Sequence, residues 1–130
     1  MKKFKKTLTA IAIIFAVLIP GSYALASGSS EYDSTYSMTG GVFGKWITTG
    51  AAPTATVTLT PSKGDSAATI TVFIQKKTDS GYTDVASKAV SSTKSSTSKF
   101  SLSKKGTYRV YLRDYAGQPM SGDITVKFKW

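Results

Sequence analysis

The sequence contains no cysteine, no histidine and no asparagine among its 130 residues. Without cysteine there is no disulfide, so an apolar core has to supply the stability of the fold. The same absences exclude histidine-dependent triads, thiol nucleophiles, and zinc, haem or iron–sulfur sites built on those ligands. Asn-Gly hairpin turns are also excluded, so glycine or aspartate must supply the tight turns.

Acidic residues are scarce, and none falls into a catalytic or metal-binding pattern. The seven are Glu31, Asp33, Asp65, Asp79, Asp84, Asp114 and Asp123. A glycosidase needs two facing carboxylates, and a calcium loop needs a dense Asp-x-Asp-x-Asp run; neither pattern is present. Aspartates at turns usually accept hydrogen bonds from local backbone amides. We therefore expect a protein that is not an enzyme, with no metal site and no cofactor.

The first 26 residues have the order of a secretory signal. A basic segment at 1–6 precedes an uncharged apolar stretch at 8–19, and the small residues Ala24 and Ala26 follow. The apolar stretch is shorter than the roughly 20 residues of a membrane-spanning helix and stops at Pro20. We expect cleavage after Ala26, secretion from a bacterium into the extracellular space, and no stable membrane insertion after cleavage.

The remaining chain alternates apolar and polar residues in short runs separated by turn residues, which is typical of a β-sandwich or barrel. The segment 27–41 is rich in serine, glycine and threonine, and is expected to be a flexible lead-in or a weak edge strand. The expected strands are 43–49, 54–60, 69–77, 82–90, 100–102, 107–114 and 123–130, with a polar loop at 91–99. We predict an all-β fold over 42–130: a single antiparallel β-sandwich of about seven strands, immunoglobulin-like or jelly-roll-like.

The two clearest strands, 107–114 and 123–130, are expected to pair in antiparallel fashion, with one face packed and one face in solvent. On that pairing their outward side chains form one patch. Its members are Arg109, Tyr111, Arg113, Lys127 and Lys129. Arginine binds phosphate through two parallel hydrogen bonds, so we predict a ligand-binding patch for a polyanion or a sugar–phosphate polymer. The alternative is an ordinary solvated face whose lysines protect an edge strand from aggregation.

Aromatic residues are the second candidate feature. Tyr82, Tyr111 and Tyr115 are candidates for stacking on sugar rings. Trp46 and Trp130 are expected in the core, since aromatic side chains bury a large apolar area.

The segment Gly106-Thr107-Tyr108-Arg109-Val110, followed by the alternating strand 123–128, resembles the end of bacterial pre-peptidase C-terminal domains. Those domains are small secreted β-sandwiches appended to exported enzymes. The resemblance implies the sandwich fold and an accessory role. The acidic calcium-binding positions frequent in that family have no counterpart here, and no functional residue is carried over.

The charge balance favours anionic partners. The net charge is +10, and loss of the four lysines at 2–6 leaves +6. A charge of this size also simply keeps a small domain soluble. We expect a secreted, non-enzymatic protein that binds an anionic cell-wall polymer or a polysaccharide of the cell envelope, with binding that weakens in salt; nucleic acid is not the expected partner. Two alternatives stay open: an antimicrobial or toxin-like protein, and an extracellular matrix or assembly protein whose threonine-rich strand 54–60 adds to a neighbour's sheet.

Overall fold

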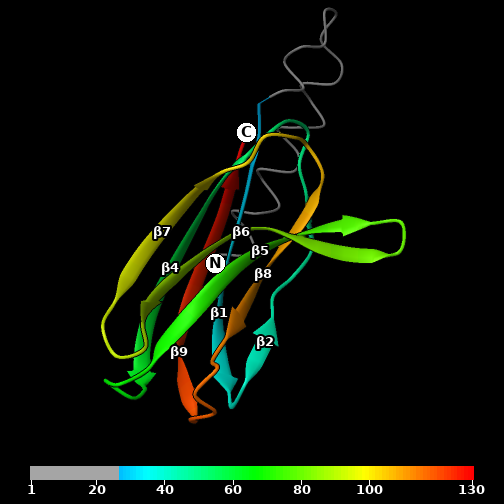
Figure 1. The fold of residues 1–130 in the computed structure, drawn as a ribbon. Helices are drawn as coiled ribbons and strands as arrows, with labels where there is room; N and C mark the ends of the chain where they lie inside the picture. The colour runs from blue at the N-terminus through cyan, green and yellow to red at the C-terminus, as the bar shows by residue number, and fades with distance from the viewer. Residues whose placement is uncertain (1–26) are drawn as a thin grey trace, which may run out of the picture.

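The computed structural model describes residues 27–130, and the predicted signal with its cleavage after Ala26 lies outside the described residues. The described chain forms nine strands in two layers (Figure 1). The strands are β1 (Ser29–Met38), β2 (Gly41–Phe43), β3 (Ile47–Thr48), β4 (Thr54–Lys63), β5 (Thr69–Thr78), β6 (Gly81–Ser91), β7 (Ser96–Ser101), β8 (Thr107–Arg113) and β9 (Met120–Lys129). The predicted all-β antiparallel sandwich is confirmed, with nine strands in place of about seven. Within 27–130, no helix is long and apolar enough to cross a membrane.

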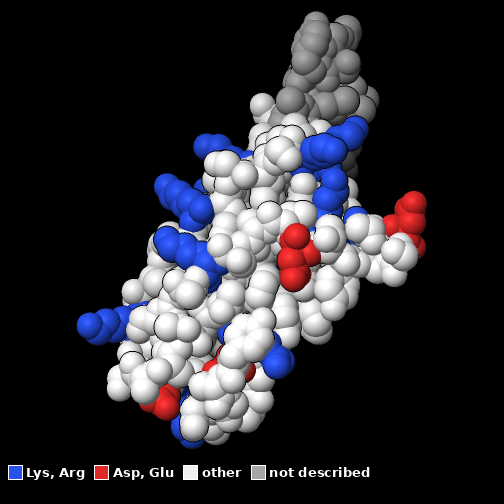
Figure 2. Space-filling view, in the orientation of Figure 1, with Lys and Arg blue, Asp and Glu red and all other residues white. Residues whose placement is uncertain are grey.

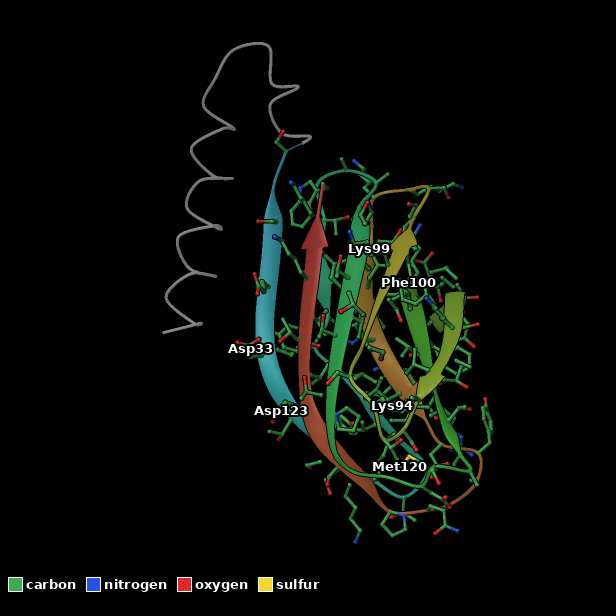
Figure 3. The ribbon with its side chains drawn as sticks, turned by 90° about the vertical axis from the view of Figure 1, so that its left-hand side faces the viewer. Asp33, Lys94, Lys99, Phe100, Met120 and Asp123 are labelled. Atoms are coloured by element: carbon green, nitrogen blue, oxygen red, sulfur yellow. The ribbon has the colours of Figure 1, made fainter. Side chains whose placement is uncertain are left out.

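The strands form two antiparallel sheets. In the first sheet the order is β1-β9-β4-β7, and Figure 3 shows these four strands side by side. In the second sheet the order is β2-β8-β5-β6, and β3 pairs with β8 beyond the end of β2. Each sheet turns one face inward, where alternate apolar side chains meet in a common core.

The last two strands lie in different sheets, so the predicted pairing of 107–114 with 123–130 is wrong. Both strands have the expected inward rows, but these rows face each other across the core. The Tyr108 ring of β8 stacks on the Phe128 ring of β9, with centroids 6.0 Å apart and planes inclined by 19°. The apolar face of a strand is buried whether the next strand in the chain joins the same sheet or the opposite one. Alternation alone therefore does not distinguish the two arrangements.

Most of the segment expected as a flexible lead-in is strand β1, and the alternative of an edge strand is the one observed. β1 pairs with β9 over its whole length, from Ser29 opposite Lys129 to Met38 opposite Met120. Its inward residues Tyr32, Tyr36 and Met38 are buried in the core. The small polar residues between them masked this spacing in the sequence. The sandwich domain therefore begins near residue 29, rather than at 42.

Strand β7 begins at Ser96, inside the expected polar loop at 91–99. Ser98 is 1% exposed and takes an inward position next to Phe100, so a hydroxyl replaces an apolar side chain in the pattern. At the other end, the expected strand 43–49 is divided into β2 and β3, because 44–46 leaves the ladder.

Strand β4 lies in the interior of the first sheet, hydrogen-bonded to β9 on one side and β7 on the other. It runs on past the expected end at Thr60, with a register irregularity between Pro61 and Lys63. Since both of its edges are occupied, the suggested addition of 54–60 to a neighbouring sheet is wrong.

Candidate functional site

The five residues of the predicted patch divide between two opposite surfaces. Arg109, Tyr111 and Arg113 point outward from β8 in the second sheet. Lys127 and Lys129 point outward from β9 in the first sheet. Because the two sheets pack through their inner faces, the outward residues of one point away from those of the other. The structure therefore does not assemble the predicted five-residue patch.

The outer face of the first sheet is dominated by hydroxyl groups. The threonines of β4 alternate outward and face residues of β9 and β7, with Lys127 opposite Thr56. Thr58 and Thr97 share a hydrogen bond of 3.2 Å, and the Thr125 hydroxyl donates to Asp33 Oδ1 at 2.6 Å. Lys127 and Lys129 thus lie among hydroxyl groups on the outer face of the first sheet, in an interior strand rather than at an edge.

The outer face of the second sheet is aromatic. We call the following set the aromatic face: Phe43, Trp46, Phe73, Tyr82 and Tyr111, gathered with Arg109. Three members are substantially exposed: Phe43 at 49%, Trp46 at 36% and Tyr82 at 50%. On the side of the molecule drawn in Figure 2, most lysines and arginines lie toward the margins, and an acidic side chain stands near the middle.

Strand register brings these rings together. Phe43 of β2 and Phe73 of β5 both lie opposite Tyr111 of β8. The Phe43 and Tyr111 centroids are 4.5 Å apart with the planes at 21°, and those of Phe73 and Tyr111 are 5.7 Å apart at 28°. Cross-strand aromatic neighbours of this kind stabilise a sheet. The result is a row of stacked rings across three strands.

Arg109 lies at the centre of the aromatic face. Its guanidinium carbon is 3.9 Å from the ring centroid of Phe43, 4.3 Å from that of Trp46 and 4.7 Å from that of Tyr82. These distances are well inside the range of cation–π attraction. The three rings come from β2, from the segment between β2 and β3, and from β6, so one guanidinium joins three separate parts of the chain.

A hydrogen-bonded chain holds the arginine in place. Arg109 Nε donates to Gln75 Oε1 at 2.9 Å, and Gln75 Nε2 donates to Asp84 Oδ1 at 2.9 Å. Gln75 is only 2% exposed, so its amide is satisfied by these two neighbours away from solvent. The chain crosses β8, β5 and β6 and fixes the cation before any ligand arrives.

Asp114 and Asp65 support turns, as the sequence predicts. Asp114 is 1% exposed; its Oδ1 accepts from the Ala116 amide and its Oδ2 from the Gln118 amide, both at 2.8 Å. Asp65 Oδ1 accepts from the Ala67 amide at 2.9 Å. Across 27–130, no group of three histidine, cysteine, aspartate or glutamate residues is placed to hold a metal ion.

Trp46 is a member of the aromatic face, so its predicted place in the core is wrong. It lies in the break between β2 and β3, where inward alternation no longer applies. Trp130 is partly buried against the core, as expected. Tyr115 is 71% exposed outside the aromatic face, and the Arg113 guanidinium carbon lies 5.0 Å from its ring centroid.

One sequence signal pointed toward the aromatic face. Phe73 lies out of phase with the inward row Ile70, Val72 and Ile74, and so marks apolar character on the opposite side of β5. The other contacts of the aromatic face depend on the pairing of β2, β5 and β8, which are far apart in the sequence.

Comparison with known proteins gives a fold and no family. No family model matches the chain, and no curated protein matches it in sequence. Among solved structures, the crystal structure of PirA is similar with a TM-score of 0.52 and 14% identity, covering 75% of this chain and 92% of that one. This likeness shows the β-sandwich architecture alone.

Two further structures are more distant. One is reported for Bacillus endospore appendages that form disulfide-linked pili, with a TM-score of 0.49, 12% identity, and coverage of 80% of this chain and 88% of that one. The other is the Yersinia pseudotuberculosis-derived mitogen, with a TM-score of 0.44, 8% identity, and coverage of 77% and 85%. None of the three is a pre-peptidase C-terminal domain, and that resemblance stays a prediction.

Proposed function

We propose that this protein is a secreted, non-enzymatic β-sandwich that binds a carbohydrate polymer of the cell envelope through its aromatic face. The observation that carries the proposal is the joint exposure of Phe43, Trp46 and Tyr82 around the fixed guanidinium of Arg109. Contiguous exposed apolar surface commonly marks an interaction site. Sugar rings suit such a surface, because they combine apolar C–H faces with hydroxyl groups at the rim.

A polysaccharide fits this surface better than a polyanion does. The charge of Arg109 is already surrounded by rings, and Arg113 lies near Tyr115. Lys127 and Lys129, the other cations of the predicted patch, point outward from the first sheet, on the other side of the molecule from the aromatic face. Contacts between rings and sugars are not screened by salt, whereas contacts between exposed charges are. Binding through the aromatic face is therefore expected to persist at high ionic strength, in contrast to the expectation from the sequence.

The test is co-sedimentation of residues 27–130 with purified cell walls and with insoluble polysaccharides, at low and high salt. Trp46→Ala and Tyr82→Ala should each lower the affinity by about tenfold, which corresponds to ~1.4 kcal/mol of lost contact energy. Tyr115→Ala is the matched control, since it removes an exposed ring outside the aromatic face. Equal losses of affinity for Tyr115→Ala and Trp46→Ala would contradict the proposal. So would co-sedimentation that disappears at high salt.

A second candidate function is assembly into a larger structure, which a different observation favours. Among the described residues, β1 is a ten-residue edge strand whose only ladder partner is β9. Free strand edges can be extended by a strand from another chain. Sedimentation velocity over a wide concentration range tests this: association that Ser34→Lys removes supports assembly through β1, and a monomer at every concentration rejects it.

A further inference from the structure

A pocket lies at one open end of the sandwich, which we call its mouth, between β6 and the connection that follows β7. Its volume is about 330 Å³. Its lining residues are Lys76, Val85, Ser101, Leu102, Ser103, Lys104 and Tyr108. The volume lies at the lower end of the range for small-molecule sites, roughly 300–1,000 Å³. No residue of the aromatic face lines this pocket.

Lys76 enters the pocket because of its position on β5. Residues two apart on a strand share a face, so Lys76 continues the inward row that ends with Val72 and Ile74. Its aliphatic stem lies over Gly106, where a Cβ atom would be 2.7 Å from Lys76 Cε. The glycine thus leaves room for the lysine stem. An inward-row ammonium is in this way placed at the mouth between the two sheets.

The loop that carries Lys104 is held at several points. The Leu102 amide donates to the Pro53 carbonyl at 3.0 Å, and the Thr49 amide donates to the Gly106 carbonyl at 2.8 Å. The Tyr108 hydroxyl donates to the Lys104 carbonyl, fixing the backbone of the lysine itself. Both cations therefore come from backbone that is already in place, which reduces the entropy lost on binding.

A β-bulge supplies an apolar wall. Ile74 lies opposite Ala86 and Gln75 lies opposite Asp84, so Val85 is the extra residue of β6. Bulges turn a side chain away from the ladder and are frequent beside functional sites. Val85 is 43% exposed and lines the pocket.

No acidic residue among those described lines this pocket, and within 27–130 neither lysine forms an ion pair. Two ammonium groups beside an apolar wall suit an anion that carries a small carbon skeleton. We propose that the pocket binds the phosphate group of a small organic phosphate ester, with Lys76 and Lys104 facing the phosphate and Val85 beside its carbon atoms. Lysine is a common phosphate ligand, acting as a point charge. The proposal does not depend on the function proposed for the aromatic face.

The test is titration of residues 27–130 with glycerol phosphate, followed by amide NMR at constant ionic strength. We expect saturable shifts at Val85 and at 102–106, with weaker binding of inorganic phosphate, which has no carbon skeleton. Lys76→Met and Lys104→Met should each weaken glycerol phosphate binding by about fivefold, the upper range for a partly exposed charge pair. Lys127→Met is the matched control: it removes the same charge from the opposite side of the first sheet and should leave the affinity unchanged.

A variant that keeps the charge separates a site from general attraction. Gly106→Ala displaces the Lys76 stem and should also weaken binding, while the other lysines stay in place. Non-saturable shifts, an equal effect of Lys127→Met, or acetate binding as tightly as glycerol phosphate would each overturn the proposal. In those cases Lys76 serves only to keep the mouth of the sandwich polar, as inward-pointing charges do at sheet edges.

Discussion

Replacing Arg109 with methionine tests whether one guanidinium organises the aromatic face. Methionine keeps much of the apolar stem and removes the charge. The change loses three cation–π contacts, each worth about 0.5–1 kcal/mol at exposed positions. It also leaves the buried Oε1 acceptor of Gln75 without its donor, which costs about 1–3 kcal/mol.

These contributions share one side chain and do not add fully. We therefore expect Arg109→Met to lower the free energy of unfolding by about 2–4 kcal/mol. For a domain of this size, that loss lowers the melting temperature by roughly 10–20 °C. The measurement is guanidinium chloride unfolding, supported by thermal unfolding.

Arg113→Met is the matched control, because Arg113 lies on the same face of β8 and has one ring nearby, that of Tyr115 at 5.0 Å. Its expected cost is below about 1 kcal/mol. Arg109→Lys keeps the charge but loses the planar group and the Nε hydrogen bond, so it should fall between the two. Indistinguishable stabilities for Arg109→Met and Arg113→Met would refute the central role of Arg109.

Three further predictions concern the core. Gly122→Ala should cost about 1–3 kcal/mol, because its Cβ would lie 2.6 Å from the Thr60 carbonyl oxygen; a chemical denaturation midpoint equal to that of the native protein would contradict this close approach. Phe128→Ala should cost about 3–5 kcal/mol, since its ring is fully buried and stacked on Tyr108; an intact, equally stable protein would show that the core can collapse around the gap. Burial raises the pKa of Tyr32, Tyr36 and Tyr108 above the ordinary value of 10.0, with the charge of Asp123 a smaller cause for Tyr36. Just above pH 10 these tyrosines stay neutral in the folded protein, whereas they ionise in the unfolded chain. Their contribution to stability is therefore complete below pH 10 and is lost as pH rises through the folded-state pKa values. Urea unfolding at a series of pH values, with tyrosinate absorbance as the ionisation signal, should show that decline in stability, and a flat profile would argue against it.

Several strands were accessible to sequence reasoning because their signal is local. In β5 and β8 the apolar residues occupy alternate positions and point inward, as the sequence predicts. Strands with polar inward residues were missed. Ser98 in β7 contributes to the packing without contributing to the hydrophobic pattern, and the serines of β1 hide the spacing of Tyr32 and Tyr36.

The candidate sites were less accessible than the strands. Arg109 and Tyr111 were singled out correctly as neighbours on one face, since residues two apart on a strand always share a face. Lys127 was assigned to the same face because β8 and β9 follow each other in the chain. Trp46 was assigned to the core, because its place in a break between two strands cannot be recognised before β2 and β8 are known to pair.

The order of residues alone sets which face of β5, β8 and β9 is apolar and where glycine- or aspartate-containing segments turn the chain. It also excluded chemistry that needs histidine or cysteine. Two features follow from the three-dimensional fold instead: β8 and β9 belong to opposite sheets, and Arg109 contacts rings from β2 and β6. The physical reason is that burial rewards any arrangement that removes an apolar face from water, whereas the choice of neighbour depends on hydrogen bonding and packing between residues far apart in the chain.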